Sequence, residues 1–526
     1  MSSVLEYSIL AVYFVALLIL MIFGAHGFVM VYYFKKHRGL QGIRLKPLPR
    51  MPAVTVQLPI FNELYVVERL IRATCRMDYA RELLEIQVLD DSTDETAAVS
   101  RRLVEEYRAQ GFNIHWQHRP QRSGFKAGAL NAGLAAATGE FIAIFDADFI
   151  PPRDFLARTL PCFAHPQIGM VQTRWGHLNA DYSLLTRLQA IGLDGHFVVE
   201  QAARNGAGFF INFNGTAGIW RKDCILDAGG WSDDTLTEDL DLSYRAQLCG
   251  WQFKFLHDPV CLSELPSEIG ALRSQQFRWT KGAIETAKKI MPRLWQARLP
   301  LRIKLQGSVH LTNNLVFPFI FIVGLLHPAL VYIKNDGVAD HTFYFGLSTV
   351  FMAAFWGSFV MYLTSQKELY PDWRKRILYF PVFMAASMGL AFNNTRAILQ
   401  GLCNRKSEFL RTPKYRIESK RDQFRGKKYF ENRRRFKWSS SGLGEILLAA
   451  YSLAGAGLSF YYLELTAIPF QGLYCFGYGF IGLLSLKQML WPQGKRFFAK
   501  ENWFSRRARP AVPVHERYLH ELASEH

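Results

Sequence analysis

Long uncharged stretches set the first limit on how this chain can fold. Residues 7–34 contain no Asp, Glu, Lys or Arg, and a backbone that crosses lipid must satisfy its own hydrogen bonds, as a helix does. The stretch is too long for the core of a signal peptide and lacks a small-residue cleavage pattern. It predicts a transmembrane helix within residues 1–34. Lys35, Lys36 and Arg38 follow it and mark its cytoplasmic end, which places the N-terminus outside.

Two further regions predict transmembrane hairpins. Residues 305–366 contain the uncharged stretches 305–333 and 342–366. The turn between these stretches is short and poor in Lys and Arg, as expected of an outside loop. Residues 446–486 contain a second pair of apolar stretches, with Glu464 at the turn. With the first helix, these two hairpins predict five membrane spans.

One more apolar region, residues 377–402, is predicted to lie in the cytoplasmic interface of the membrane. Residues 404–437 hold 14 Lys and Arg against 4 acids, and the tail 487–526 is also basic. Such segments favour the cytoplasmic side, whereas a span at 377–395 would carry both of them outside. We therefore predict an interface helix followed by a cytoplasmic basic region at 403–440. A true sixth span remains the alternative.

The pattern changes between the first helix and the first hairpin, at residues 50–295. Strand-like segments at 53–63, 81–90 and 141–145 alternate with amphipathic helical ones, which predicts an α/β domain with a mostly parallel sheet. Ligands bind such sheets beyond the carboxyl ends of the strands. The polar side chains at those ends are Asn62, Glu63, Asp90, Asp91, Asp146 and Asp148.

Two carboxylates one residue apart end the apolar strand in "FIAIFDADFIPP" (141–152). Residues two apart in an extended segment face the same side, so Asp146 and Asp148 are expected to point into one crevice. Two like charges there would repel each other unless a cation joined them. A divalent cation that also binds a substrate phosphate fits this arrangement. Asp148 and Asp146 are therefore the predicted ligands of Mg²⁺ or Mn²⁺.

The remaining composition excludes several classes of site. The seven cysteines show no paired spacing, which argues against a zinc site and against a disulfide framework. The net charge is +18, and residues 404–437 supply more than half of this excess. Because that segment adjoins the membrane stretches, we expect membrane lipids among the partners and no nucleic acid.

Seven motifs together resemble those of membrane-bound family-2 glycosyltransferases with the GT-A fold. This family includes cellulose synthase, hyaluronan synthase and the plant cellulose-synthase-like mannan and glucan synthases. The resemblance covers about residues 50–420 and implies a Rossmann-like GT-A domain inserted between transmembrane helices, a nucleotide-sugar donor, a divalent metal and an inverted linkage. The motifs are "PIFNE" (59–63), "VLDDSTD" (88–94), "RSGFKAGALN" (122–131), "FDADF" (145–149), "FNGTAGIWR" (213–221), "TEDLDLSYR" (237–245) and "QQFRW" (275–279).

The resemblance assigns one set of residues to the donor. Lys126 opens a helix in a glycine-bracketed loop, where charge and helix dipole both favour a phosphate. Arg278 can pair bidentately with the diphosphate. Turn formation alone is the alternative for "PIFNE", and Ser92 is expected to cap the following helix. The residues assigned to the nucleotide sugar are Pro59, Phe61, Glu63, Asp90, Lys126, Asp146 and Arg278.

A second set is assigned to the acceptor. The reaction must deprotonate an acceptor hydroxyl, and by resemblance the general base is Asp239. Thr237 could cap the helix that begins there, where Glu238 and Asp239 would be favoured in any case. Trp279 offers a flat face on which a sugar ring can stack, although an interfacial anchor is the alternative. The residues assigned to the acceptor are Asn214, Gly215, Gln275 and Trp279.

The segment "FLRTPK" (409–414) resembles the gating loop of the family, with Phe409, Thr412 and Lys414 at matching positions. Arg411 replaces the usual Val, and Pro413 stiffens the segment, which puts its motion in question. The alternative is a basic linker that binds anionic lipid.

These features predict an inverting, processive hexosyltransferase with a cytoplasmic catalytic domain in the inner or plasma membrane. It would extend a β-linked polysaccharide, such as a β-1,4-glucan or a mannan, and pass the growing chain across the membrane. UDP-glucose is the expected donor and GDP-mannose the second choice. One alternative is a single-transfer glucosyltransferase with a ceramide or diacylglycerol acceptor. The other is a transporter or scaffold without catalysis.

Overall fold

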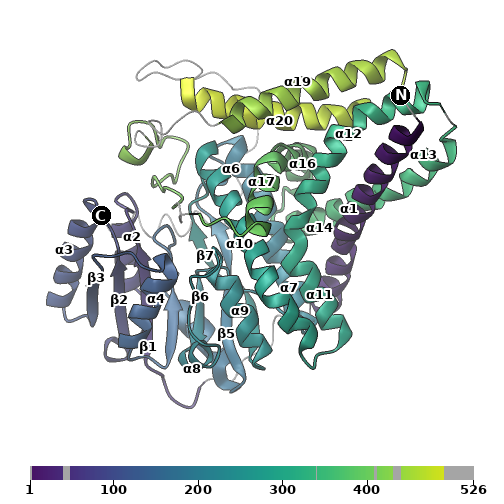
Figure 1. Ribbon diagram of the computed structural model, residues 1–526. Helices are drawn as coiled ribbons and strands as arrows, with labels where there is room; N and C mark the ends of the chain where they lie inside the picture. The colour runs from purple at the N-terminus through teal and green to yellow at the C-terminus, as the bar shows by residue number, and fades with distance from the viewer. Residues whose placement is uncertain (1–2, 39–47, 339, 408–410, 431–439, 491–526) are drawn as a thin grey trace. The chain divides into compact units, whose positions relative to one another are not determined.

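The computed structural model describes residues 3–38, 48–338, 340–407, 411–430 and 440–490 (Figure 1). It confirms the predicted fold class: a mixed α/β sheet of Rossmann-like topology with long apolar helices before and after it in the chain.

One seven-stranded sheet forms the centre of the α/β domain, with strand order β3-β2-β1-β4-β6-β5-β7. β1 pairs in parallel with β2 and β4, while β6 runs antiparallel to both of its neighbours. The register places Ile60 beside Asp90 and Gln57 beside Ile144, so the strand-end side chains meet at one edge. The strands are β1 (Val54–Ile60), β2 (Leu84–Asp90), β3 (Ile114–His118), β4 (Phe141–Ile144), β5 (Ile168–His177), β6 (Gly218–Arg221) and β7 (Gln252–Ser263).

Helices cover both faces of the sheet because its strands are apolar on both sides, as expected of parallel strands. Alternate residues of β4 show this directly, since Ala143 belongs to one core and Ile142 to the other. The second core also takes in Phe34 from the end of the N-terminal helix. The helices of this domain are α2 (Val67–Cys75), α3 (Thr96–Ala109), α4 (Phe125–Ala136), α5 (Phe155–Thr159), α6 (Leu184–Asp194), the π-helix η4 (Gly195–Gln201), α7 (Ala202–Gly206), α8 (Lys222–Asp227), α9 (Glu238–Leu248) and α10 (Ile269–Gln296).

Among the described residues, four helical stretches are long and apolar enough to cross a membrane: Ser3–His37, Leu301–Asp336, Thr342–Leu369 and Gly442–Tyr461. The pair Trp373–Gly389 and Ala391–Leu402, bent by 44°, would make a fifth if it counted as one span. The helices of this part are α1 (Ser3–His37), α11 (Leu301–Thr312), α12 (Val316–Asp336), α13 (Thr342–Ser348), α14 (Met352–Leu369), α15 (Trp373–Arg376), α16 (Phe380–Gly389), α17 (Ala391–Leu402), α19 (Ser440–Tyr461) and α20 (Ile468–Leu490).

The predicted hairpin at 446–486 appears as α19 and α20, which run side by side (Figure 1). The region predicted as an interface helix, residues 377–402, contains α16 and α17. Here α17 lies along α10 of the α/β domain: Asn393 Nδ2 donates to the carbonyl of Arg273 at 3.3 Å. The described part of this region is therefore attached to the α/β domain.

Candidate active site

A cavity opens at the carboxyl ends of β1 and β4, between the sheet and α10. Apart from Asp90, every described residue that the sequence indicated for the site lines it; Phe409 lies outside the described residues. These lining residues are Pro59, Phe61, Glu63, Lys126, Asp146, Asp148, Asn214, Gly215, Asp239, Gln275, Arg278, Trp279, Thr412 and Lys414. Residues distant in the chain thus meet in one place.

The two aspartates after β4 reach this cavity, each facing a lysine. Asp146 Oδ1 lies 2.5 Å from Lys126 Nζ. Asp148 Oδ2 lies 2.8 Å from Lys414 Nζ, and only 10% of the Asp148 side chain is exposed. Both carboxylates therefore lie on the cavity, each paired with an ammonium group that a bound cation would have to displace. Such a pair of hard oxygen donors fits Mg²⁺ or Mn²⁺ when a substrate phosphate completes the coordination.

Lys126 lies in the first turn of α4, where the preceding Gly124 adopts a left-handed φ of +68°. Its ammonium donates to Asp146 and, at 2.8 Å, to the carbonyl of Gly215. Burial disfavours the charged lysine, but Asp146 and the acids of α9 outweigh it and raise the pKa of Lys126. The lysine therefore remains a cation at the start of a helix, as a phosphate site requires.

Asp239 lies in the first turn of α9, on the same cavity. A Cβ atom added to Gly215 would stand 3.0 Å from Asp239 Oδ2, so glycine leaves room for this carboxylate. Burial, and then the neighbouring Glu238, raise the pKa of Asp239 to about 7. A carboxylate with such a pKa is suited to general-base chemistry near neutral pH. The third acid of the motif, Asp241, pairs with Arg245 at 2.8 Å inside the protein and has a structural role.

Gln275, Arg278 and Trp279 come from α10, and their spacing of three and four residues places them on one helical face. The helix packs closely beside the start of α9, because a Cβ at Gly282 would lie 2.6 Å from the side chain of Thr237. This contact brings the "QQFRW" residues and Asp239 to the same cavity.

The expected cap at Ser92 is wrong, and the alternative of a cap at Thr237 has no hydrogen bond to support it. Ser92 does not cap α3, because that helix begins only at Thr96; its hydroxyl instead accepts the backbone N–H of Asn62 at 2.8 Å. Thr237 precedes α9 but makes no side-chain capping bond. Asp90 is fully buried and accepts a hydrogen bond from Trp116 Nε1 at 3.1 Å. It does not line the cavity, so the structure does not support its predicted contact with the donor.

Several residues that line the cavity were not predicted from the sequence. The guanidinium of Arg122 stacks 3.5 Å above the ring of Phe61, and burial lowers the pKa of Arg122 to about 10. Trp175 of β5 and Glu264 after β7 also line the cavity. Arg122 lies within a recognised motif and could have been found. Trp175 and Glu264 lie at the ends of strands that no motif marks.

The described part of the "FLRTPK" segment lies across the cavity. Arg411, which departs from the family pattern, binds both carboxylate oxygens of Glu63 at 2.5 and 2.6 Å. Burial raises the pKa of Glu63 to about 7, although Arg411 opposes this shift. Thr412 is buried in the cavity wall, and its hydroxyl has no hydrogen-bond partner among the described residues. The segment thus contributes polar groups along the length of the cavity.

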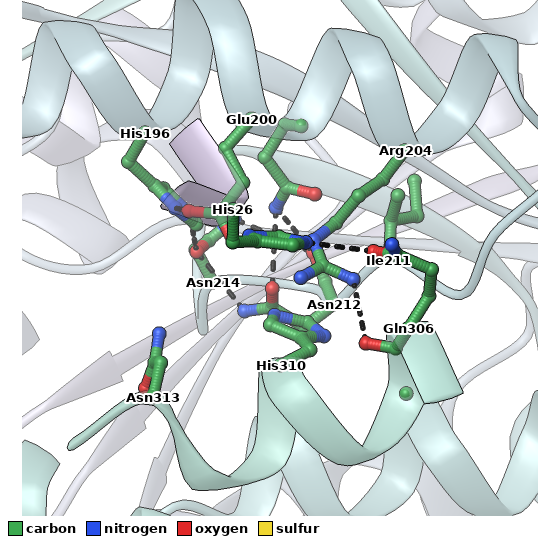
Figure 2. A network of polar contacts seen from close by, with 12 residues as sticks. His26, His196, Glu200, Arg204, Ile211, Asn212, Asn214, Gln306, His310 and Asn313 are labelled. Carbon is green, nitrogen blue, oxygen red and sulfur yellow. Dashed lines mark hydrogen bonds and ion pairs between the residues drawn. The ribbon is translucent and has the colours of Figure 1, made fainter. Parts of the chain in front are cut away.

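A polar network continues from the acceptor side of the cavity toward the apolar helices (Figure 2). His196 on the π-helix η4 contacts Asn214 Oδ1 and Glu200 Oε2, each at 3.0 Å. Glu200 pairs in turn with Arg204 at 3.1 Å. Arg204 also donates to the carbonyl of Gln306 on α11 at 3.2 Å. Burial opposes ionisation of Glu200, but His196 and Arg204 hold its pKa well below the usual value.

Several known proteins are similar to this chain in sequence. Residues 51–282 match the model of the family described as "Glycosyltransferase like family 2". Glucomannan 4-beta-mannosyltransferase 2 of Arabidopsis thaliana is 46% identical over 248 residues, covering 46% of each chain. Glucomannan 4-beta-mannosyltransferase 1 of Oryza sativa subsp. japonica is 42% identical over 268 residues, covering 50% of this chain and 51% of its own. This chain spans about half the length of the curated relatives it matches.

A solved structure agrees in fold. The mannosyltransferase PcManGT from Pyrobaculum calidifontis, in complex with GDP-Man and Mn²⁺, superposes with a TM-score of 0.51. It is 20% identical, and the match covers 74% of this chain and all of PcManGT, so the likeness shows the fold. The α/β domain at residues 51–282 is therefore similar to the family-2 glycosyltransferases.

Proposed function

We propose that this protein is an inverting hexosyltransferase that extends a β-linked polysaccharide from a nucleotide sugar. The observation that carries the proposal is the arrangement of Asp239: its raised pKa, and its place on one cavity with Lys126, Arg278 and the two aspartates after β4. The mannosyltransferase relatives support transfer of a hexose.

In the proposed reaction, Asp239 removes a proton from the acceptor hydroxyl while that oxygen attacks the anomeric carbon of the donor. One displacement of this kind inverts an α-linked donor to a β-linkage. Lys126 and Arg278 neutralise the charge that develops on the leaving diphosphate. A divalent cation held by Asp148 and Asp146 would supply further charge neutralisation there. Trp279 positions the terminal sugar of the acceptor.

For the donor we propose GDP-mannose. UDP-glucose was the first choice from sequence, but the relatives bear the names of mannosyltransferases and do not support it. Their names also include glucomannan, so a mannose-containing β-1,4-linked chain is the proposed product. The Phe61–Arg122 stack and the Glu63–Arg411 pair are the proposed contacts of the nucleoside.

We further propose that the product leaves through the membrane helices. A second cavity of about 840 Å³ lies among α1, α12, α14 and α16, with Glu200 and Arg204 in its wall. The network in Figure 2 joins this wall to Asn214 in the wall of the first cavity. A polar connection between the two cavities favours a polymeric acceptor over a lipid acceptor, which would not need to move from one cavity to the other.

A donor screen on the purified protein tests the proposal. Nucleotide release is measured with GDP-mannose, UDP-glucose and UDP-N-acetylglucosamine in the presence of Mn²⁺, and the product is then sized after digestion with a β-mannanase. We expect release from GDP-mannose and an insoluble, mannanase-sensitive product. Lys428→Met, on the exposed side of the domain, serves as the unaffected control. A radiolabelled product that partitions into the lipid extract would instead identify the lipid-acceptor enzyme, and no turnover of any donor would favour a transporter or scaffold.

A further inference from the structure

Three consecutive residues of the segment 411–416 are fixed by one acid. Glu264 follows β7 directly and is only 2% exposed. Its carboxylate accepts the backbone N–H of Tyr415 at 3.0 Å and that of Arg416 at 2.9 Å. Its backbone carbonyl accepts a hydrogen bond from Lys414 Nζ at 2.6 Å. None of the family motifs includes Glu264.

The backbone of the same segment is strained where Glu264 holds it. Arg416 adopts a φ of +53°, in the left-handed region that residues other than glycine rarely occupy. Such a conformation persists only where surrounding contacts determine it. The hydrogen bonds from Tyr415 and Arg416 to Glu264 are contacts of this kind.

Held in this way, Lys414 reaches the aspartate that the metal would use. Lys414 Nζ lies 2.8 Å from Asp148 Oδ2, and 10% of each side chain is exposed. Arg69 also approaches Asp148, but it donates to the backbone carbonyl at 3.0 Å and leaves the carboxylate to Lys414. Lys414, from the segment that resembles the gating loop, thus pairs with the Asp148 carboxylate on the side that faces the cavity.

We propose that Glu264 is a positioning residue: it holds the segment 411–416 so that Lys414 and a divalent cation compete for Asp148. The inference rests on the proposed function for the metal itself. An Asp148 oxygen paired with an ammonium group is not available to a metal ion. The apparent metal affinity is therefore lowered by the fraction of molecules in which Asp148 is free. Arrival of the metal releases Lys414, whose ammonium is then available to a phosphate oxygen of the donor.

Binding of Mn²⁺ to the detergent-purified full chain, without any nucleotide, tests this competition. The free ion is quantified by electron paramagnetic resonance, so activity is not the readout. If nine in ten molecules hold the Lys414–Asp148 pair, Lys414→Met is expected to raise Mn²⁺ affinity about tenfold. Glu264→Gln is also expected to raise the Mn²⁺ affinity, although Lys414 is still present, because an amide holds the segment less firmly than the carboxylate does.

Two controls and a second variant make the result decisive. Lys428→Met removes a lysine outside the segment 411–416 that pairs with Glu95 on the surface, and it is expected to leave Mn²⁺ affinity unchanged. Asp148→Asn is expected to abolish binding. If Glu264→Gln does not fold, Arg416→Pro serves as the second variant. It removes one of the two N–H donors, and because proline cannot adopt the φ of +53° it also releases the backbone that Glu264 holds, so it is expected to raise the affinity.

Unchanged or weaker Mn²⁺ binding in Lys414→Met would overturn the competition. A gain in Lys414→Met without a gain in Glu264→Gln or Arg416→Pro would overturn the role of Glu264. Because no donor is present, a failed sugar-transfer assay leaves both results intact. Loss of Mn²⁺ binding in every variant and in the native protein would overturn this inference together with the metal in the proposed reaction.

Discussion

Burial of Asp239 determines how the proposed reaction depends on pH. The pKa of about 7 arises from burial first and from Glu238 second. A general base must be deprotonated, so kcat/KM is expected to rise about tenfold per pH unit below pH 7 and to level off above it. Asp239→Asn should lower transfer by roughly 10²–10⁴-fold while nucleotide binding changes little. A mutant that loses nucleotide affinity in proportion to its activity would assign Asp239 to the donor.

The same burial predicts an effect on stability. Because the pKa of Asp239 is raised from 3.8 to about 7 on folding, the folded state binds this proton more tightly than the unfolded chain. The stability gained from this proton is fully present below pH 3.8 and is lost as the pH rises through about 7. Asp239→Asn removes the buried charge, so its Tm should exceed that of the native protein at pH 8. Thermal unfolding at pH 5 and pH 8 measures the difference, which should shrink at the lower pH; a lower Tm at pH 8 would contradict the buried charge.

Variants of Trp279 distinguish acceptor binding from the chemical step. If its indole stacks on the terminal sugar, Trp279→Ala should abolish polymer synthesis. Part of the donor hydrolysis should survive, because a water molecule that attacks the donor does not need an aromatic ring to position it. Trp279→Phe should retain more synthesis than the alanine variant, since a smaller flat face remains. Nucleotide release and polymer yield are measured on the same preparations.

Trp295 provides the control for Trp279, because it lies on the same helix but is not part of the cavity lining, and 45% of it is exposed. Trp295→Ala should change neither measurement. If hydrolysis and polymer fall together in both Trp279 variants, that residue is an interfacial anchor and the platform role is wrong.

Among the elements, the contact between α1 and α14 depends on small residues. A Cβ at Gly357 would collide with the backbone oxygen of Gly24, and one at Gly24 would lie 2.5 Å from the backbone oxygen of Ala354. Small residues allow such close approach of apolar helices. Gly357→Ala should therefore destabilise the protein by about 1–3 kcal/mol, as other overpacked contacts do. Thermal unfolding in detergent measures this.

Gly457→Ala in α19 is the matched control, because a Cβ there meets nothing within 4 Å. It should be neutral or slightly stabilising, since alanine favours a helix over glycine. Equal Tm values for the two variants would show that α1 and α14 do not pack as closely as the structure has them.

Local patterns predict the elements well and their contacts poorly. The apolar run before Asp146 predicts β4, and the strand ends predict the cavity, because strand register follows from buried alternation. The cap assigned to Ser92 is wrong because the turn after β2 uses that hydroxyl to bind Asn62 instead. Glu264 and Arg411 belong to the site through contacts between distant segments, and no local pattern in one sequence encodes such pairs.

At the scale of the whole molecule, the basic segment and the α/β domain must lie on one side of the membrane. Arg411 binds Glu63, Tyr429 donates to Asp94 at 2.6 Å, and Arg69 binds Glu418 at 2.6 Å. Such contacts require an even number of crossings between α10 and residue 404. The stretches Leu301–Asp336 and Thr342–Leu369 are long and apolar enough to supply two, so the bent pair α16 and α17 is proposed to enter the interface without crossing it.

Cysteine labelling tests this topology. Lys420 is exposed on the basic segment and is a suitable site for the cysteine. In a background without Cys249, Cys403 and Cys475, Lys420→Cys should resist a membrane-impermeant thiol reagent in intact cells and react after lysis. Val338→Cys, 68% exposed between the two predicted spans of the first hairpin, should react in intact cells.

Labelling of both Lys420→Cys and Val338→Cys in intact cells would make α16 and α17 a true span. It would also place Lys414 across the membrane from Asp148, so the contact between them, and the competition with the metal, could not exist. Labelling of Lys420→Cys with protection of Val338→Cys until lysis would reverse the proposed orientation. Only protection at residue 420 together with labelling at residue 338 is consistent with two crossings, a cytoplasmic active site and a product that leaves on the far side.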